Sequence, residues 1–191
     1  MEKIQKQFCI LFIIVLSISL YLVGCTSEKP TPDSTLTQNP PESSPVTEVP
    51  FHAQIDPPEG WEEHESTSPR ALLYYIRSHN TRTAQFFIYA DRARVSIDKK
   101  IEDLIENHER EYEYVQFAEP QDMTIDDYPG KLIKYSYIDT YGSQRIYTNI
   151  FIIIDDWLFT ILYQGNQVED YNLYEEEFFD IIPTIQIRPT S

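Results

Sequence analysis

The chain has 191 residues, of which 15 are basic and 31 are acidic, so its formal net charge is −16. This length suits one ordinary domain with accessory segments. The acidic balance excludes a general nucleic-acid binder, because neutralising phosphates requires clustered positive charge. A hydrophobic fraction of 41% and an aromatic fraction of 14% exclude a wholly disordered chain.

The first 24 residues have the parts of an export signal. Lys3 and Lys6 provide the positive charge, and an apolar run from Phe8 to Leu22 follows them. The run is shorter than the ~20 residues that a membrane-spanning helix needs, and its length is typical of a signal-peptide core. We therefore expect residues 1–24 to direct export and to be removed.

The apolar run ends in Leu22-Val23-Gly24-Cys25, which resembles the lipobox of bacterial lipoproteins. The resemblance implies that the signal peptidase recognises Leu22, Val23 and Gly24. It also implies that Cys25 is diacylated on its sulfur and becomes the first residue of the mature chain. Two acyl chains give stable anchoring, so the expected location is the extracytoplasmic side of a bacterial cell membrane. An uncleaved anchor helix with a chance cysteine is the alternative.

Residues 25–50 have the composition of a tether. Six of the 13 prolines and nine Ser or Thr residues lie between residues 26 and 50, and no aromatic residue does. Such a segment buries too little apolar surface to offset the entropy lost on ordering. Proline also favours an extended form of up to ~3.1 Å per residue. We expect a disordered spacer that holds the domain away from the membrane.

Residues 51–191 form the predicted domain, with 13 of the 14 Tyr, eight of the ten Phe and both Trp. Aromatic and β-branched runs at 71–77 and 84–90 predict a hairpin. Apolar residues at helical spacing predict a helix over 98–112, and Asp98 suits its N-terminus. A further strand is expected at 114–117 or 121–125.

The second half of the domain predicts three more strands and a second helix. Residues 126–130 have the composition of a turn. Strands are expected at 131–138, 145–154 and 157–164, with Asp155-Asp156 as a two-residue hairpin loop. Aromatic residues at helical spacing predict a helix over 168–182 that ends before Pro183. Residues 184–187 are a candidate edge strand.

The two strands at 145–164 are apolar on both faces, and a sheet that is buried on both sides must be covered on both sides. The two predicted helices are the available covers. The expected fold class is therefore α+β, with an antiparallel β-sheet covered by helices on both faces.

Several short stretches resemble the PsbP-like family, whose α/β/α sandwich also occurs in Mog proteins and small bacterial lipoproteins. They are Pro58-Glu59-Gly60-Trp61, Tyr128-Pro129-Gly130 before an alternating strand, and the final Phe178-Phe179-Asp180-Ile181-Ile182-Pro183. The resemblance covers residues 51–188. It implies a fold and a non-enzymatic binding or assembly role, and it provides no catalytic residues.

Searches for chemistry in the sequence point away from an enzyme. Both cysteines lie within the first 25 residues, so the domain has no cysteine for a disulfide, a metal site or catalysis. The nucleophile motif Gly-x-Ser-x-Gly does not occur. Neighbouring carboxylates lie in expected turns or strands, where they do not converge. We therefore predict no metal and no cofactor. The four histidines are isolated, and His108 is expected at the edge of the core (His52, His64, His79, His108).

Positive charge is concentrated in one part of the acidic domain. Seven of its 12 basic residues lie between positions 70 and 100, where only two acidic residues oppose them. A basic end of this kind would suit an anionic wall polymer, lipid headgroups or an acidic protein. Ordinary solubilising charge is the alternative. The candidate contact surface consists of four arginines (Arg77, Arg82, Arg92, Arg94).

The expected function is therefore that of a membrane-anchored lipoprotein that binds a protein or an envelope component without catalysis. A second hypothesis is a lipoprotein that holds a small molecule between sheet and helix, in a cleft lined by Tyr135, Tyr137 and Tyr163. A wall-active hydrolase, which would need convergent carboxylates, is the third.

Overall fold

The structure is a computed structural model that describes residues 48–190. The predicted signal peptide, Cys25 and most of the predicted tether lie outside these residues. Within residues 48–190, no helix is long and apolar enough to cross a membrane. The strands are β1 (Phe51–Gln54), β2 (Trp61–Glu63), β3 (Ala71–His79), β4 (Arg82–Arg92), β5 (Glu113–Phe117), β6 (Gln121–Ile125), β7 (Tyr128–Ile138), β8 (Gln144–Ile154), β9 (Trp157–Gly165) and β10 (Gln186–Pro189).

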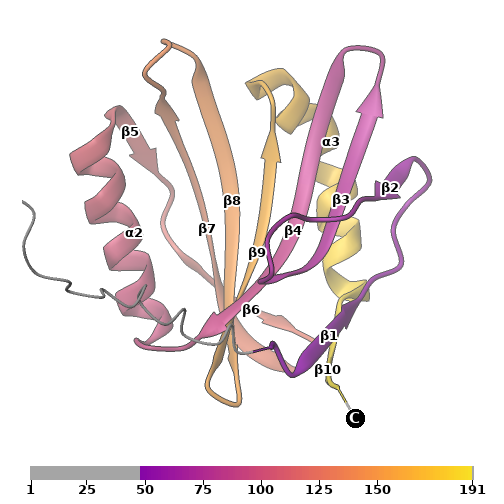
Figure 1. Cartoon of the computed structure of the whole chain (residues 1–191). Helices are drawn as coiled ribbons and strands as arrows, with labels where there is room; N and C mark the ends of the chain where they lie inside the picture. Colours follow the sequence, from indigo (N-terminus) through magenta and orange to yellow (C-terminus); the bar gives the residue numbers. More distant parts are fainter. Residues whose placement is uncertain (1–47, 191) are drawn as a thin grey trace, which may run out of the picture. The chain divides into compact units, whose positions relative to one another are not determined.

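An antiparallel sheet dominates the domain, with strand order β2-β3-β4-β9-β8-β7-β5 and β6 also paired with β7 (Figure 1). The helices are α2 (Ile97–Glu111) and α3 (Val168–Ile181), and the short 3₁₀ turn η1 (Ile182–Thr184) follows α3. The prediction of an α+β fold built on an antiparallel sheet is confirmed, as are the first hairpin and both helices.

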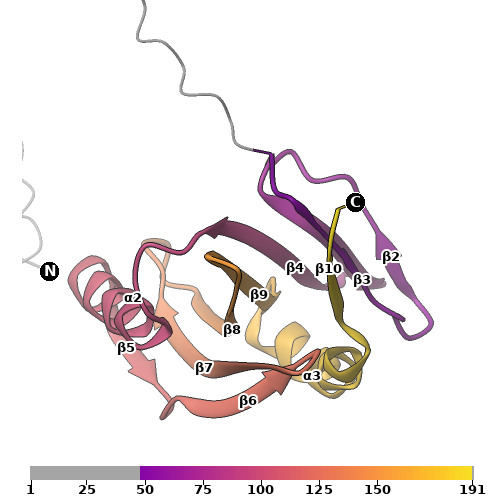
Figure 2. The ribbon, with the colours of Figure 1, turned by 90° about the horizontal axis from the view of Figure 1, so that it is seen from below.

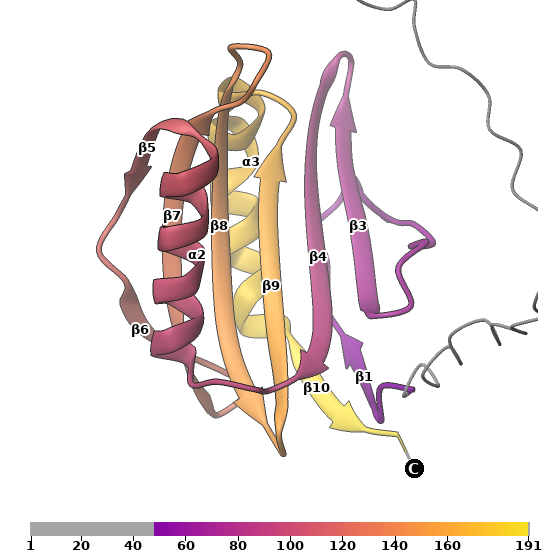
Figure 3. The same cartoon turned by 60° about the vertical axis from the view of Figure 1, so that its left-hand side comes forward.

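The core consists of two clusters that divide β8 between them. Ile150 and Ile152 belong to the larger cluster, which contains the buried residues of α3. Phe151 belongs to the smaller cluster, which contains Ile101 of α2. Successive residues of a strand point to opposite faces, so both faces of β8 are buried in apolar surroundings. Figure 3 shows α2 in front of β7 and β8 and α3 behind the sheet.

Two hairpin loops consist of paired aspartates with positive φ angles. Asp155 and Asp156 have φ values of 46° and 65°, and Asp126 and Asp127 have 49° and 69°. Such angles are typical of type I′ turns, in which Asp is tolerated. The turn prediction for 126–130 was too long, because β7 already begins at Tyr128. Gly130 lies inside this strand, where an added Cβ would be 2.4 Å from the Ile152 side chain.

Helix α2 begins one residue earlier than expected, and its cap differs from the prediction. The hydroxyl of Ser96 accepts a hydrogen bond from the backbone N–H of Lys99 at 3.2 Å, so Ser96 is the N-cap. Asp98 lies in the first turn instead, where a negative charge is favourable next to the positive end of the helix dipole.

A two-stranded ribbon of β1 and β10 joins the two ends of the described chain. Figure 2 shows it beside α3 and β3, apart from the main sheet. The backbone N–H of Thr190 donates to the carbonyl of Pro50 at 2.9 Å. Phe51 packs edge-on against Phe159, with ring centroids 5.2 Å apart. Chain entry and exit therefore lie together, near the β8–β9 hairpin (Figure 1).

Candidate functional site

The end of the domain opposite this chain entry has two of its most exposed aromatic residues. Tyr141, in the β7–β8 turn, is 91% exposed, and Tyr114, just after α2, is 75% exposed. Strand β8 has 11 residues, so about 33 Å separate its two ends at ~3.3 Å per residue. We call this region, residues 111–114 and 138–142, the distal site.

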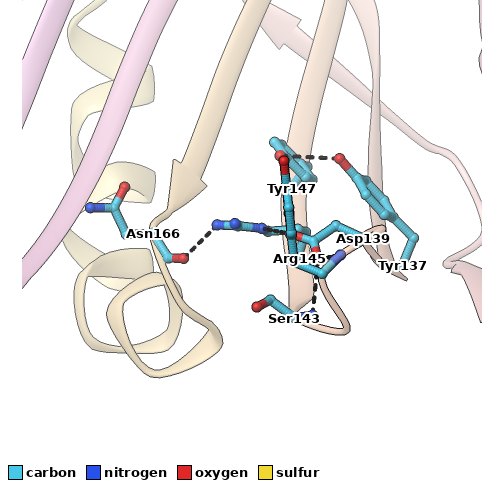
Figure 4. A network of polar contacts seen from close by, with 7 residues as sticks. Tyr137, Asp139, Ser143, Arg145, Tyr147 and Asn166 are labelled. Atoms are coloured by element: carbon cyan, nitrogen blue, oxygen red, sulfur yellow. Dashed lines mark hydrogen bonds and ion pairs between the residues drawn. The ribbon is translucent and has the colours of Figure 1, made fainter.

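A hydrogen-bond network makes the β7–β8 turn rigid (Figure 4). The carboxylate of Asp139 accepts hydrogen bonds from the backbone N–H groups of Tyr141 and Ser143, both at 2.9 Å. It also accepts one from the Arg145 guanidinium at 2.8 Å, and Arg145 in turn donates to the carbonyl of Asn166 at 2.7 Å. The turn is thus joined to the loop before α3, and Tyr141 is held on a fixed backbone.

Stacked tyrosines support the distal site from below. The rings of Tyr112 and Tyr137 stack with centroids 4.1 Å apart, and those of Tyr137 and Tyr147 with centroids 5.7 Å apart. Tyr135 stacks on Tyr147 at 5.3 Å. His108 packs edge-on against Tyr135 at 4.8 Å. The expected position of His108 at the core edge is confirmed, since its ring is half-buried and its Nδ1 hydrogen-bonds the Leu104 carbonyl.

The distal site contains a shallow groove of about 490 Å³. Its lining combines aromatic and aliphatic surface with carboxylates that are accessible to solvent. Apolar and aromatic groups supply contact area, and the few polar groups orient what is bound. The lining residues are Glu111, Tyr112, Glu113, Tyr114, Ile138, Asp139, Thr140 and Gly142.

The titration behaviour of these groups indicates structural roles. Hydrogen bonds from the Ser143 backbone and from the Arg145 guanidinium lower the pKa of Asp139 below its usual range. Burial is the main cause that raises the pKa of Tyr135 and of Tyr137, and the nearby Tyr147 raises both further. Asp139 therefore remains an anion and the tyrosines remain neutral at physiological pH. Within residues 48–190, no group of three or more His, Cys, Asp or Glu side chains is placed to hold a metal ion.

The structure separates the four predicted contact arginines into two pairs. Arg77 donates to the Glu177 carboxylate at 3.1 Å, and Arg82 lies 3.7 Å from the buried carboxylate of Asp170. Both Arg77 and Arg82 lie near the β3–β4 hairpin. Arg92 is at the other end of β4, with its guanidinium 4.4 Å from the centre of the Trp157 ring.

Arg94 is also exposed and lies two residues beyond Arg92, so β4 and its 11 residues separate the two pairs. The four arginines do not form one patch. Their role in contacting a partner stays a prediction.

The predicted tyrosine cleft does not exist as a single cleft. Tyr135 pairs across the sheet with Tyr147, and Tyr147 pairs with Gln164. Tyr163 is the neighbour of Gln164 and therefore points to the opposite face. There its hydroxyl donates to the Tyr171 carbonyl at 2.6 Å and its ring stacks on Phe178.

Sequence reasoning placed a turn at 140–143 but did not identify the distal site. The residue that could have indicated the site is Tyr141, an aromatic side chain in the middle of a polar turn, where it has no strand or helix partner. Tyr114 gave no comparable signal. It has a φ angle of 58°, which is uncommon for a residue of its size.

Comparison with known proteins shows likeness at the level of structure only. No protein-family model matches the sequence, and no curated protein matches it. A Pseudomonas aeruginosa protein of unknown function, PA94, is similar in structure with a TM-score of 0.53 and 16% identity, over 73% of this chain and 99% of that one. LpqN of Mycobacterium tuberculosis, described as involved in cell envelope biogenesis, has a TM-score of 0.54 and 12% identity, over 78% of this chain and 88% of that one.

The solution structure of cyanobacterial PsbP (CyanoP) from Synechocystis sp. PCC 6803 is more distant. It has a TM-score of 0.45 and 8% identity, over 78% of this chain and all of that one. This likeness is too low to define a shared fold. The class that the structure and the first two likenesses define is an α+β domain with an antiparallel sheet and two helices.

Proposed function

We propose that this protein is a lipid-anchored binding or assembly module on the extracytoplasmic side of a bacterial cell membrane, without catalysis of its own. Cys25 is the lipidated residue, and residues 26–50 are the tether. The domain is a PsbP-like α/β/α sandwich, and its partner is a protein or polymer of the envelope. The envelope role described for LpqN supports this proposal.

The observation that carries the proposal is the position of the distal site. The chain enters the domain at Pro50, and the exposed Tyr141 lies at the opposite end of β8. A tether attached at one end leaves the other end accessible to a partner. Exposed tyrosines on a rigid turn are typical of interaction hot spots, because little side-chain entropy is lost when they bind.

The two arginine pairs fit this orientation. Arg92 and Arg94 lie at the end where the chain enters, where they would face anionic lipid headgroups. Arg82 lies at the distal end and is available to an acidic partner, because half of its side chain is exposed.

Site-specific photocrosslinking in intact cells tests the distal site. The photoreactive residue p-benzoylphenylalanine replaces Tyr141 in one strain and Asp155, at the opposite end, in a control strain. We expect a discrete crosslinked envelope component at position 141 and none at position 155. Tyr114→Ala should lower the crosslink yield by about tenfold, as expected for a hot-spot aromatic residue. Equal crosslinking at both positions would contradict the proposal.

The anchor is tested separately by metabolic labelling. Radiolabelled palmitate should be incorporated into the wild-type chain, and Cys25→Ser should abolish the label and release the protein from the membrane fraction. Retention of the Cys25→Ser protein in that fraction would instead support the uncleaved anchor helix.

One observation favours small-molecule binding as a second candidate. Asn149, on β8, is 6% exposed, and its side-chain oxygen has no hydrogen-bond partner among the described residues. Its amide donates to the Tyr135 hydroxyl at 3.5 Å, on the face where α2 packs. A bound ligand would satisfy this oxygen. It would add RT ln(1 + [L]/Kd) to the free energy of unfolding and so raise the melting temperature. Screening envelope metabolites by thermal shift, with Asn149→Leu as control, tests this.

A further inference from the structure

One face of β3, β4 and β9 is covered by neither of the described helices. Helix α2 packs on β5, β7 and β8 and stops short of this part of the sheet, whereas α3 packs on the opposite face (Figure 3). We call this surface the open face. Its side chains are all half-buried: Tyr74, Ile76, Gln85, Phe87, Tyr89, Thr160, Leu162 and Gln164.

The centre of the open face is aromatic and apolar. The ring of Phe87 stacks on that of Tyr74, with centroids 4.3 Å apart and an interplanar angle of 7°. It also stacks on Tyr89 at 5.4 Å and 14°. These three residues, Ile76 and Leu162 belong to neither core cluster. The solvated face of an antiparallel sheet is normally polar, so an apolar one indicates a binding surface.

The size of the open face favours a short peptide over a folded partner. Its eight side chains are each more than half buried, so together they expose on the order of 400 Å². A stable complex between folded proteins buries about 800 Å² on each side. A second copy of this chain would therefore be held too weakly, whereas a peptide of several residues would cover the surface.

The backbone beneath the open face restricts which peptide conformation binds. Strands β3, β4 and β9 are paired with their neighbours along this region, so their N–H and C=O groups are used within the sheet. An extended β-strand lying on this face would gain no backbone hydrogen bonds with the sheet. A polyproline II helix has no internal hydrogen bonds and lacks N–H groups at its prolines.

The tyrosine hydroxyls of the open face complement such a ligand. Among the described residues, the hydroxyls of Tyr74 and Tyr89 have no hydrogen-bond partner and are free to donate to peptide carbonyls. One side-chain N–H of Gln164 donates to the Gln85 oxygen at 2.7 Å.

The border of the open face next to β2 is acidic. Glu62 pairs with Ile76 in the β2–β3 register and so shares its face. A groove of about 410 Å³ adjoins Tyr74, and Glu65 and His64 are among its lining residues. A basic residue at one end of the peptide would be attracted to this border.

We propose that the open face binds a proline-rich polypeptide segment in polyproline II conformation, with a basic residue placed at the Glu62 and Glu65 border. The stacked rings of Tyr74, Phe87 and Tyr89 form a continuous apolar surface on which successive prolines pack. This site is separate from the distal site and is independent of the function proposed for it.

The test is fluorescence polarisation with the detergent-solubilised full chain. The probe is a labelled dodecapeptide of Pro-Pro-Leu repeats with an arginine at each end, titrated with protein to about 1 mM. We expect saturable binding that weakens about tenfold with Phe87→Ala. Glu62→Lys with Glu65→Lys should weaken binding about threefold or more, and only for the peptide that contains arginine. Tyr141→Ala is the matched control and should leave binding unchanged.

Three results would overturn the proposal. The first is the absence of saturation by the wild-type chain, and the second is equal affinity for a peptide with alanine in place of every proline. The third is saturable binding of a chitooligosaccharide that Phe87→Ala abolishes, which would identify the open face as a sugar-binding surface. If Phe87→Ala fails to fold, the variant Glu62→Lys with Glu65→Lys still tests the proposal, because Glu62 and Glu65 lie at the surface.

Discussion

Gly165, at the end of β9, lies against the first turn of α3, and Gly165→Ala tests how closely these elements pack. An added Cβ would lie 2.3 Å from the backbone N of Tyr171 and 2.7 Å from the carbonyl of Gln167. Both contacts are with backbone, so relief requires α3 to move by about 1 Å. That movement would disturb Tyr171 and Phe178, which are fully buried. Overpacking typically costs about 1–3 kcal/mol, and we expect the upper end of this range here.

Urea denaturation followed by circular dichroism measures this loss. With an m-value of about 2 kcal/mol per M, a cost of ~3 kcal/mol lowers the midpoint by about 1.5 M. Gly142→Ala is the control, because no atom lies within 4 Å of its added Cβ and only its φ of +78° is unfavourable. That strain costs about 1 kcal/mol. If Gly165→Ala lowered the midpoint no more than Gly142→Ala does, the packing argument would be wrong.

Three further predictions concern pH and buried polar groups. Burial alone would raise the pKa of Asp126, but hydrogen bonds from Arg188 and the Ile187 backbone lower it overall. Asp126→Asn should therefore be less stable than wild type at pH 7. The difference should shrink as the pH falls below the ordinary Asp value and vanish below the lowered pKa of the folded state, as measured by urea midpoints at a series of pH values down from 7. Burial raises the pKa of Tyr163, so in the unfolded chain this hydroxyl ionises at a lower pH than in the folded protein. Stability should therefore fall as the pH rises above about 10, and tyrosine absorbance at 295 nm should increase together with unfolding. The buried carboxylate of Asp170 accepts a hydrogen bond from the Thr83 backbone at 3.3 Å, so Asp170→Ala should lower the unfolding free energy by about 1–3 kcal/mol in the same urea assay.

The elements that sequence analysis predicted correctly are those with a strong local pattern. The apolar runs before and after Asp155-Asp156 defined β8 and β9 almost to the residue. Helix α2 followed from its apolar spacing. These signals depend on neighbours along the chain, so one sequence contains them.

The elements that it missed depend on partners far apart in the chain. Strand β1 was not predicted, and of β10 only a candidate edge strand at 184–187 was; the two have four residues each and pair across more than 130 positions. Gly130 was placed in a turn because turns are the usual site of glycine, whereas it makes room for the neighbouring strand. The prediction of a tyrosine cleft was wrong for the same reason, since the register between β8 and β9 decides which face Tyr163 occupies.

The β1–β10 ribbon has a mechanical consequence. A pull transmitted through the N-terminal segment reaches β1 first. Strand β1 is held by its four-residue ladder with β10, by the hydrogen bond from Thr190 to Pro50 and by the packing of Phe51 on the core. The main sheet takes no part in that ladder. Under load this ribbon therefore yields before the sheet does, lengthening the connection while the eight-stranded part stays folded.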